Sequence, residues 1–277
     1  MSPVTDVQVF PVLTPTLLPA THTNSYALGD REVLLVEPAT PYPDEQRAWL
    51  GWAEGLRAEG RTLKGIFVTH HHPDHLGGAT VLAAALGVPV FAHPFTAEKL
   101  DVPEICRLHD GDVVTLDGPT PKRWDVLFTP GHAPGHLCLH DGQAGVLVVG
   151  DMVASVGTIL IAPGDGDMIS YLDQLRRLSA LQARWALPAH GEAIEQPSQL
   201  FERYVAHRLM RERIVLDAVA TAGPGGISFE LVLPRAYGDV PAAVLPIAAL
   251  SLRAHMDKLV VEGKVREARG LLFAEAS

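Results

Sequence analysis

The segment Thr69-His70-His71-His72-Pro73-Asp74-His75 holds the densest group of metal-binding side chains in the sequence. Imidazole is the commonest protein ligand for zinc, and a carboxylate is its usual companion. A tight loop that leaves a strand can aim residues two apart in the same direction. His70 and His72 could then share one metal ion, while Asp74 and His75 reach a second one nearby. The chain has 13 histidines, and this clustering indicates metal chemistry.

Three later motifs each place a metal-binding side chain directly after an apolar, strand-like run. Strand ends are where the ligand sites of layered α/β folds usually lie. Taken singly, each side chain would be read as an ordinary polar turn residue, but together with the histidine cluster they form a ligand set. The motifs are Thr129-Pro130-Gly131-His132, Val148-Val149-Gly150-Asp151 and Pro188-Ala189-His190-Gly191.

Other polar residues near these motifs have weaker signals. Thr69 is expected to orient a ligand by hydrogen bonding. His71 is expected to point away from its neighbours, and His136 to be structural or to support a ligand. The remaining histidines lie in no recognisable pattern and are read as ordinary surface or core residues. They are His22, His93, His109, His140, His207 and His255.

Strands and helices alternate along the chain through about residue 195, which predicts layered α/β packing. Lys64–Thr69 reads as a buried strand that ends in the histidine cluster, and Leu76–Leu86 reads as the helix that follows. Pro73 would stiffen the turn between them. Gly77 and Gly78 would let the backbone pass closely where the helix begins.

From Ser198 onward the pattern is mostly helical and ends in a small hairpin. Three helices followed by a hairpin is the order of a winged-helix module. The sequence therefore predicts a catalytic domain over residues 1–197 and a winged-helix-like domain over residues 198–277. The predicted elements are helices Ser198–Ala222, Ile227–Ala236 and Val244–Glu262, and hairpin strands Lys264–Ala268 and Leu271–Ala274.

The motifs resemble those of the metallo-β-lactamase superfamily, whose signature is His-x-His-x-Asp-His after a strand. The resemblance implies a four-layer αββα fold. It makes His132 the third ligand of the first metal, Asp151 a carboxylate that bridges both metals, and His190 the last ligand of the second. The implied ligand set is His70, His72, Asp74, His75, His132, Asp151 and His190.

Less specific features of the chain resemble the β-lactamase-like protein 2 group of that superfamily. Thr23-Asn24-Ser25-Tyr26 is similar to a segment near the start of those proteins. Leu34-Leu35-Val36-Glu37-Pro38 stands where relatives have a strand ending in Asp, so Glu37 is a departure. The tail is similar to their winged-helix appendage, and Arg211-Glu212-Arg213-Ile214 belongs to it.

The resemblance implies a dinuclear hydrolase that uses a metal-bound hydroxide. Asp74 would orient the attacking water and move a proton, beside its role as a ligand. Zinc is the preferred metal because the ligands are imidazole and carboxylate with no thiolate, although iron or manganese would accept the same set. No Gly-x-Ser-x-Gly segment suggests a serine nucleophile.

Three functions are compatible with this site. The first is hydrolysis of a small-molecule ester, thioester or lactam-like bond, which the net charge of -10 favours. The second is cleavage of single-stranded RNA, with Arg266 and Arg269 on the wing as contacts. Residues 198–277 hold ten Lys and Arg against nine Asp and Glu, so the tail's charge adds little to this alternative. The third is an iron-bound oxygenase or redox enzyme.

The sequence also suggests where the protein works and with what. No signal peptide or membrane-spanning run is recognised, so a cytoplasmic protein with no membrane partner is expected. Cys106 and Cys138 match no zinc or redox motif and are expected to be free. The apolar region Val240–Glu262 is expected to cover the mouth of the active site or to form a homodimer contact.

Overall fold

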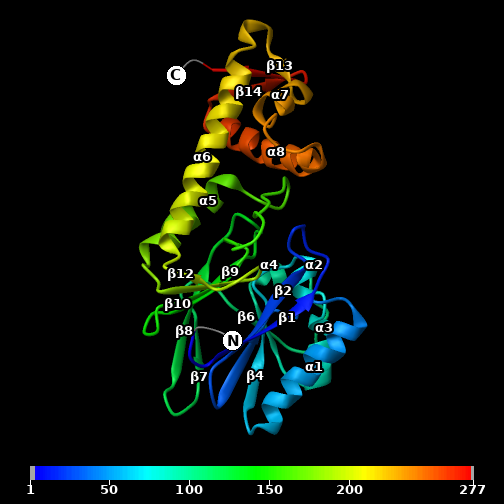
Figure 1. Cartoon of the computed structure of the whole chain (residues 1–277), viewed down its shortest axis with the longest axis vertical. Coiled ribbons are helices and arrows are strands. Elements are labelled where there is room, and N and C mark those ends of the chain that lie inside the picture. The colour runs from blue at the N-terminus through cyan, green and yellow to red at the C-terminus, as the bar shows by residue number, and fades with distance from the viewer. Residues whose placement is uncertain (1–3, 276–277) are drawn as a thin grey trace.

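The computed structural model describes residues 4–275 and shows two parts joined by one long helix, α6 (Ser198–Ala220). The larger part contains two sheets with helices outside them, and the smaller part lies at the far end of α6 (Figure 1). Within the described residues, no helix has the length and apolar character needed to cross a membrane.

The first sheet is built from the N-terminal part of the chain, in the strand order β1-β2-β3-β4-β5-β6. Strands β1 to β3 pair antiparallel, whereas β3 to β6 pair parallel. Parallel pairing requires crossover connections, and helices provide them. The strands are β1 (Val7–Leu13), β2 (His22–Leu28), β3 (Glu32–Val36), β4 (Thr62–Phe67), β5 (Val90–Ala92) and β6 (Ile105–Arg107), and the helices are α1 (Pro43–Ala58), α2 (Pro73–Leu76), α3 (Ala79–Leu86) and α4 (Pro94–Ala97).

The second sheet follows in the order β12-β11-β10-β9-β8-β7. Its pairs are antiparallel except β10 with β11, which are parallel. Helix α5 (Met168–Ala180) lies between β10 and β11 in the chain. The strands are β7 (Val113–Leu116), β8 (Lys122–Phe128), β9 (Leu137–Asp141), β10 (Val146–Gly150), β11 (Trp185–Pro188) and β12 (Ile194–Glu195).

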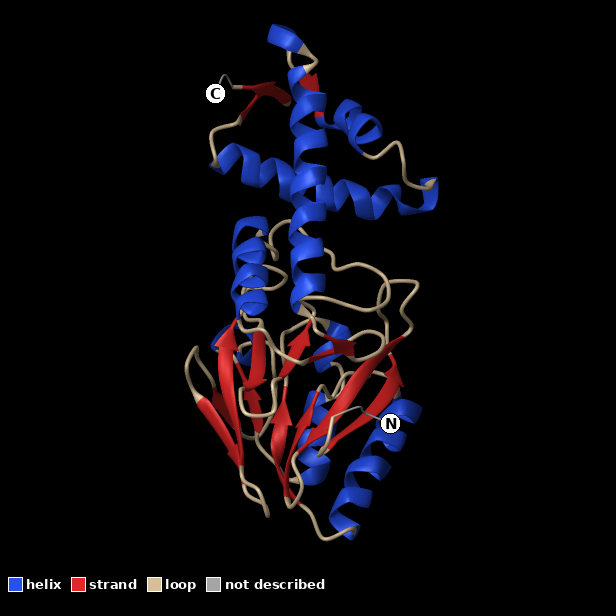
Figure 2. Cartoon of the chain, turned by 60° about the vertical axis from the view of Figure 1, so that its left-hand side comes forward, coloured by secondary structure: helices blue, strands red, loops and turns tan. Residues whose placement is uncertain are grey.

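Three apolar cores hold these layers together. Leu34 and Phe67 of the first sheet meet Val126 and Leu139 of the second in the central core. The opposite face of the first sheet packs on α1 and α3, and that of the second sheet packs on α5 and α6. Figure 2 shows the helices outside the paired sheets. The predicted four-layer αββα arrangement is confirmed.

The topology brings four chain segments to one edge of this sandwich. β4 ends just before the histidine cluster, and β8, β10 and β11 end just before the metal-binding side chains of the three later motifs. In the second sheet β8 and β10 run in the same direction, since each is antiparallel to β9, and β11 is parallel to β10. Their carboxyl ends therefore meet at the same edge, which is where α/β folds place ligands.

The predicted helix Leu76–Leu86 is wrong in one respect, because α2 and α3 are separate. Gly77 and Gly78 lie between them. A Cβ on Gly77 would lie 2.5 Å from the carbonyl oxygen of Pro73, and one on Gly78 would lie 2.8 Å from that of Pro38. The close backbone passage expected at these glycines is present, and it breaks the helix.

The C-terminal part has its own core, in which the end of α6 packs with two helices and a three-stranded sheet of order β13-β15-β14. The predicted helix Ile227–Ala236 begins with a short strand instead.

The start of α6 packs on the second sheet through Phe201, and its end joins the C-terminal core through Val215. Both parts share this helix, so a division at residues 197/198 stays a prediction. The remaining elements are β13 (Ile227–Ser228), α7 (Phe229–Ala236), α8 (Leu245–Val261), β14 (Val265–Ala268), β15 (Leu271–Ala274) and the 3-10 turns Gly223–Gly225 and Ala242–Val244.

Candidate metal centre

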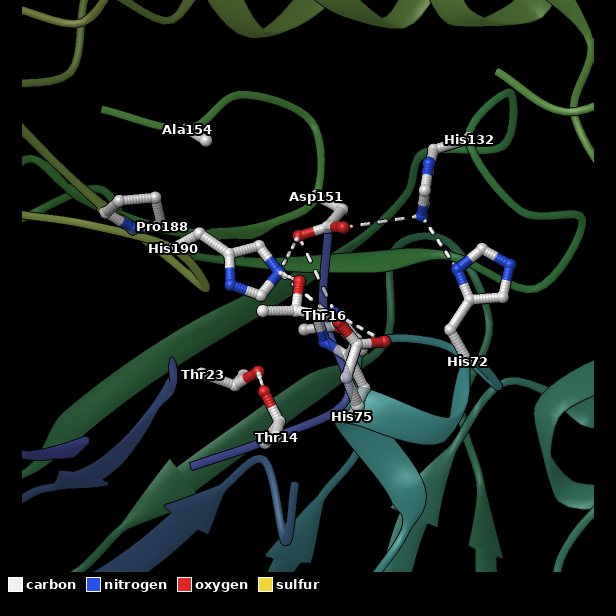
Figure 3. A network of polar contacts seen from close by, with 12 residues as sticks. Thr14, Thr16, Thr23, His72, His75, His132, Asp151, Ala154, Pro188 and His190 are labelled. Carbon is white, nitrogen blue, oxygen red and sulfur yellow. Dashed lines mark hydrogen bonds and ion pairs between the residues drawn. The ribbon is translucent and has the colours of Figure 1, made fainter. Parts of the chain in front are cut away.

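Three imidazoles converge at the edge of the sandwich. His70 and His72 follow β4, and His132 follows β8. Nε2 of His132 lies 3.1 Å from Nε2 of His70 and 2.9 Å from Nδ1 of His72, and the last two atoms are 2.9 Å apart. Figure 3 shows the rings of His132 and His72 turned toward each other. These atoms are spaced as three ligands of one cation would be.

The outer nitrogens of these rings show which inner nitrogens lack a proton. Nδ1 of His132 lies 2.8 Å from the carbonyl oxygen of Leu160, and Nε2 of His72 lies 2.6 Å from Oδ2 of Asp165. Neither oxygen can donate, so both ring nitrogens must carry the hydrogen. In neutral rings, Nε2 of His132 and Nδ1 of His72 then carry no hydrogen, and their lone pairs face each other.

A second group of ligand atoms adjoins the first. Oδ1 of Asp151 lies 3.4 Å from Nε2 of His190 and 3.6 Å from Nε2 of His75. The carboxylate of Asp74 lies 3.8 Å from His75 and 3.6 Å from His190. Oδ2 of Asp151 also lies 3.5 Å from His132 of the first group. Asp151 therefore lies between the two groups, where a bridging carboxylate would be (Figure 3).

Burial and charge make the two groups electrostatically different. Burial, followed by the neighbouring ring of His75, holds the pKa of His70 well below its ordinary value. Burial likewise lowers the pKa of His132 to about 4. Burial opposes protonation of His75 as well, but the carboxylates of Asp151, Glu37 and Asp74 outweigh it and raise that pKa well above its ordinary value. Burial thus keeps His70 and His132 of the first group neutral, whereas the carboxylates around His75 in the second group favour its charged form.

Each ligand imidazole has a polar group behind it. The expected hydrogen bond of Thr69 is confirmed, with Oγ1 2.9 Å from Nδ1 of His70. Nδ1 of His190 donates to the carbonyl oxygen of His22, and Nδ1 of His75 lies 3.3 Å from Oε1 of Glu37. Such outer partners set the tautomer and the direction of a metal-binding ring.

His136 supports the centre without joining it. Its Nε2 accepts the backbone N–H of Asp151 at 3.1 Å, and its Nδ1 lies 2.8 Å from Oγ1 of Thr129. The turn that presents Asp151 also needs Gly150, whose φ is +47°. A Cβ there would lie 2.6 Å from Nε2 of His136.

His71 differs from the expectation that it points away from its neighbours. Its Nε2 lies 3.3 Å from Oδ1 of Asp165, the carboxylate that also binds His72. His71, His72 and Asp165 thus form a small outer cluster beside the main one. Both cysteines are free, as expected, and Cys138 is buried.

Several residues at the centre carried no recognised signal in the sequence. Asp165 lies in the loop before α5, and Thr16 in the loop between β1 and β2, where its Oγ1 is 3.4 Å from Nε2 of His190. Glu37 stood out only as a departure from a relative's Asp. Spacing alone gave no sign that any of the three approaches a ligand.

A cavity of about 200 Å³ opens over the cluster. Asp74, His132, Asp151 and His190 lie on its floor, and within residues 4–275 no lysine or arginine lines it. The other lining residues are mostly apolar. They include Leu17, Ala20, Ala154, Val156, Leu160 and Ala162.

The fold and the site together define a hydrolase-type α/β sandwich with a histidine and carboxylate cluster at the ends of its strands. The chain belongs to the metallo-beta-lactamase superfamily, whose family model matches residues 18–190. Its members are generally hydrolytic enzymes. A second family model, the beta-lactamase associated winged helix domain, matches residues 228–271 and confirms the predicted module.

Individual proteins are similar over nearly the whole chain. A "Beta-lactamase-like protein 2 homolog" of Drosophila melanogaster is 27% identical over 88% of this chain and 84% of its own. A metallo-beta-lactamase family protein from Thermus thermophilus superposes with a TM-score of 0.76 at 25% identity, covering 98% of this chain and 99% of its own. A beta-lactamase domain protein from Burkholderia ambifaria has a TM-score of 0.83 at 21% identity, covering 100% and 93%, which shows the fold alone.

Proposed function

We propose that the protein is a dinuclear zinc hydrolase that cleaves an ester, thioester or lactam-like bond in a small molecule. His70, His72 and His132 would hold the first ion. Asp74, His75 and His190 would hold the second, with Asp151 shared between the two.

The main support for this proposal is one contact, in which Nδ1 of His72 lies 2.9 Å from Nε2 of His132. In neutral rings the hydrogens lie on the far sides, toward Leu160 and Asp165, so two lone pairs point at each other without a hydrogen between them. Two such acceptors repel unless a cation lies where they converge. The residues therefore fit a bound metal ion.

The type of ligand favours zinc. The seven side chains offer imidazole and carboxylate donors and no thiolate, and zinc accepts both at low coordination number. Bound divalent ions would supply a water acidified enough to attack at neutral pH, and positive charge to offset the oxyanion that develops.

The chain's own residues would do the rest. Asp74 lies on the floor of the cavity with its side chain 15% exposed, so it can orient a water and accept its proton. Leu17 and Leu160 add an apolar wall to this cavity. Because no cationic side chain of the described residues lines this cavity, it suits the uncharged part of a substrate.

The RNA alternative has less support. Of the two arginines expected on the wing, Arg266 pairs with Glu275 at 2.9 Å and stacks on Phe273. A paired guanidinium is less available to a phosphate backbone. Arg269 has a φ of 53° and lies in the turn between β14 and β15.

The test is a metal analysis followed by parallel assays on a thioester, an activated phosphodiester and a single-stranded RNA. We expect about two zinc ions per chain and turnover of the thioester, with loss of at least about a hundredfold in kcat for Asp74→Ala. His109→Ala, an exposed histidine outside the cluster, is the matched control. RNA cleavage that depends on Asp74 would overturn the choice of substrate, and oxygen uptake with bound iron would support the oxygenase alternative.

A further inference from the structure

A second cavity, of about 270 Å³, adjoins the one over the His/Asp cluster. Gly157 and Thr158 line both cavities, so the two adjoin at this segment. We call the second one the α6 cavity, because helix α6 supplies most of its wall. Its other lining residues are Leu200, Arg203, Tyr204, His207 and Arg208.

Arg208 is a buried cation with no acidic partner. The residue is 6% exposed. One of its nitrogens, Nη2, donates to the carbonyl oxygen of Ile159, and its guanidinium lies 5.8 Å from the centre of the Tyr171 ring. No carboxylate of residues 4–275 forms an ion pair with it. Burial of a charge is costly unless an opposite charge is supplied.

The other buried cations of the structure are paired, which makes Arg208 distinctive. Arg211, three residues further along α6, lies 2.9 Å from Asp239. Lys258 of α8 lies 2.8 Å from Glu212. Among the buried cations of residues 4–275, Arg208 alone therefore lacks a carboxylate partner.

Arg203 adds a second positive charge to the same cavity. It is exposed, and in the described part of the chain it makes no hydrogen bond or ion pair. His207, also in the wall, has its pKa lowered by partial burial and then by the charges of Arg208 and Arg211. The cavity thus presents two guanidinium groups and no carboxylate.

We propose that the α6 cavity is an anion subsite that binds a phosphate monoester on the leaving-group part of the substrate, whose scissile bond lies over the His/Asp cluster. This rests on the proposed function. A phosphate monoester carries nearly two negative charges at neutral pH, which matches the two arginines, and guanidinium forks suit its oxygens. The preferred substrate is then an ester or thioester with an uncharged acyl group and a phosphorylated alcohol or thiol.

Arg208 also connects this subsite with the cluster. Ile159, which accepts from Arg208, precedes Leu160, whose carbonyl orients His132. Replacement of Arg208 would therefore disturb a ligand as well as the subsite. Arg203 makes no such contact, so it is the residue to change.

The experiment compares two thioesters that differ only in the phosphate, S-acetylpantetheine and S-acetyl-4′-phosphopantetheine. We expect the wild type to show a KM about tenfold lower for the phosphorylated thioester, as for one charge-assisted contact. The ratio of the unphosphorylated to the phosphorylated KM should fall toward one in Arg203→Ala and below one in Arg203→Glu. Arg213→Ala, exposed on the same helix and outside both cavities, should keep the ratio of the wild type.

Equal KM values in the wild type, or a ratio unchanged in Arg203→Glu, would overturn the proposal. If neither thioester is cleaved, the proposed function is at fault and the subsite is tested by calorimetry with pantetheine and 4′-phosphopantetheine. Tighter binding of the phosphorylated thiol, lost in Arg203→Glu and kept in Arg213→Ala, would support the subsite alone. Equal binding of the two thiols would exclude it.

Discussion

Nε2 of His72 lies 2.6 Å from Oδ2 of Asp165, a residue 93 positions further along the chain. This contact places the ring proton of His72 on the side away from the cluster and leaves Nδ1 free to bind. It also fixes the direction of the ring. The carboxylate of Asp165 is thus a positioning group for a proposed metal ligand.

Asp165→Ala should weaken binding of the first metal ion by about 10- to 100-fold, because His72 loses its outer partner. Asp165→Asn keeps an oxygen that can accept the proton of His72, so it should restore much of the affinity. Competition with a chromogenic chelator measures this. Asp173→Ala removes an exposed acid of α5 and is the control. Unchanged affinity in Asp165→Ala would contradict the assignment.

His132→Ala and His190→Ala should each lower the zinc content from about two ions to about one per chain, since each removes one imidazole from a different group. Plasma mass spectrometry of the purified variants measures the content. His140→Ala, remote from both groups, should keep the content of the wild type. A full complement of metal in either ligand variant would argue against the ligand set.

Gly150→Ala should destabilise the protein and reduce its metal content. The added Cβ would lie 2.6 Å from Nε2 of His136 and displace the turn that presents Asp151. Gly87→Ala is the matched control, because its φ of +64° imposes a similar backbone cost but nothing lies within 4 Å of the new atom. Urea unfolding should show that the free energy of unfolding falls by about 1 kcal/mol in Gly87→Ala. It should fall clearly further in Gly150→Ala. Equal losses would show that the contact with His136 is unimportant.

The buried pair of Glu212 and Lys258 should make the C-terminal part sensitive to acid. Burial tends to raise the pKa of Glu212, but the ring of His255, 3.9 Å away, and the hydrogen bond from Lys258 outweigh this and lower it from the ordinary 4.5. A lowered folded-state pKa means that the unfolded chain binds more protons. The stabilisation is therefore present above pH 4.5 and is lost as the pH falls through the folded-state value.

Glu212→Gln measures that contribution. At pH 7 it should lower the free energy of unfolding by about 2 kcal/mol, because the buried Lys258 loses one of its two carboxylate partners while Glu262 stays 2.6 Å from it. The difference from the wild type should shrink steadily below about pH 4.5. Glu54→Gln, which removes one partner of an exposed pair on α1, should change little at either pH. A difference for Glu212→Gln that is independent of pH would exclude the ionic explanation.

The sequence by itself determined the fold class and the set of converging side chains. Residues such as His70 and Asp74 can be recognised as metal ligands from a short stretch of sequence, because imidazole and carboxylate at this spacing have few uses other than metal binding. Apolar runs that end in polar motifs placed these side chains at strand ends. The order of helices and hairpin in the winged-helix module could also be predicted. The short strands β6, β12 and β13 were missed because they have only two or three residues.

Only the tertiary structure decided which groups stand behind those side chains. Asp165, the carbonyl of Leu160 and the carbonyl of His22 reach ligands through loops that are not periodic, and any residue type can supply a carbonyl. The burial of Arg208 without a carboxylate partner also follows only from the tertiary structure. In the sequence this residue is one of several charges on an amphipathic helix. Hydrophobic periodicity and ligand chemistry act over a few residues, whereas tautomers, cavities and unpaired charges depend on how distant segments pack.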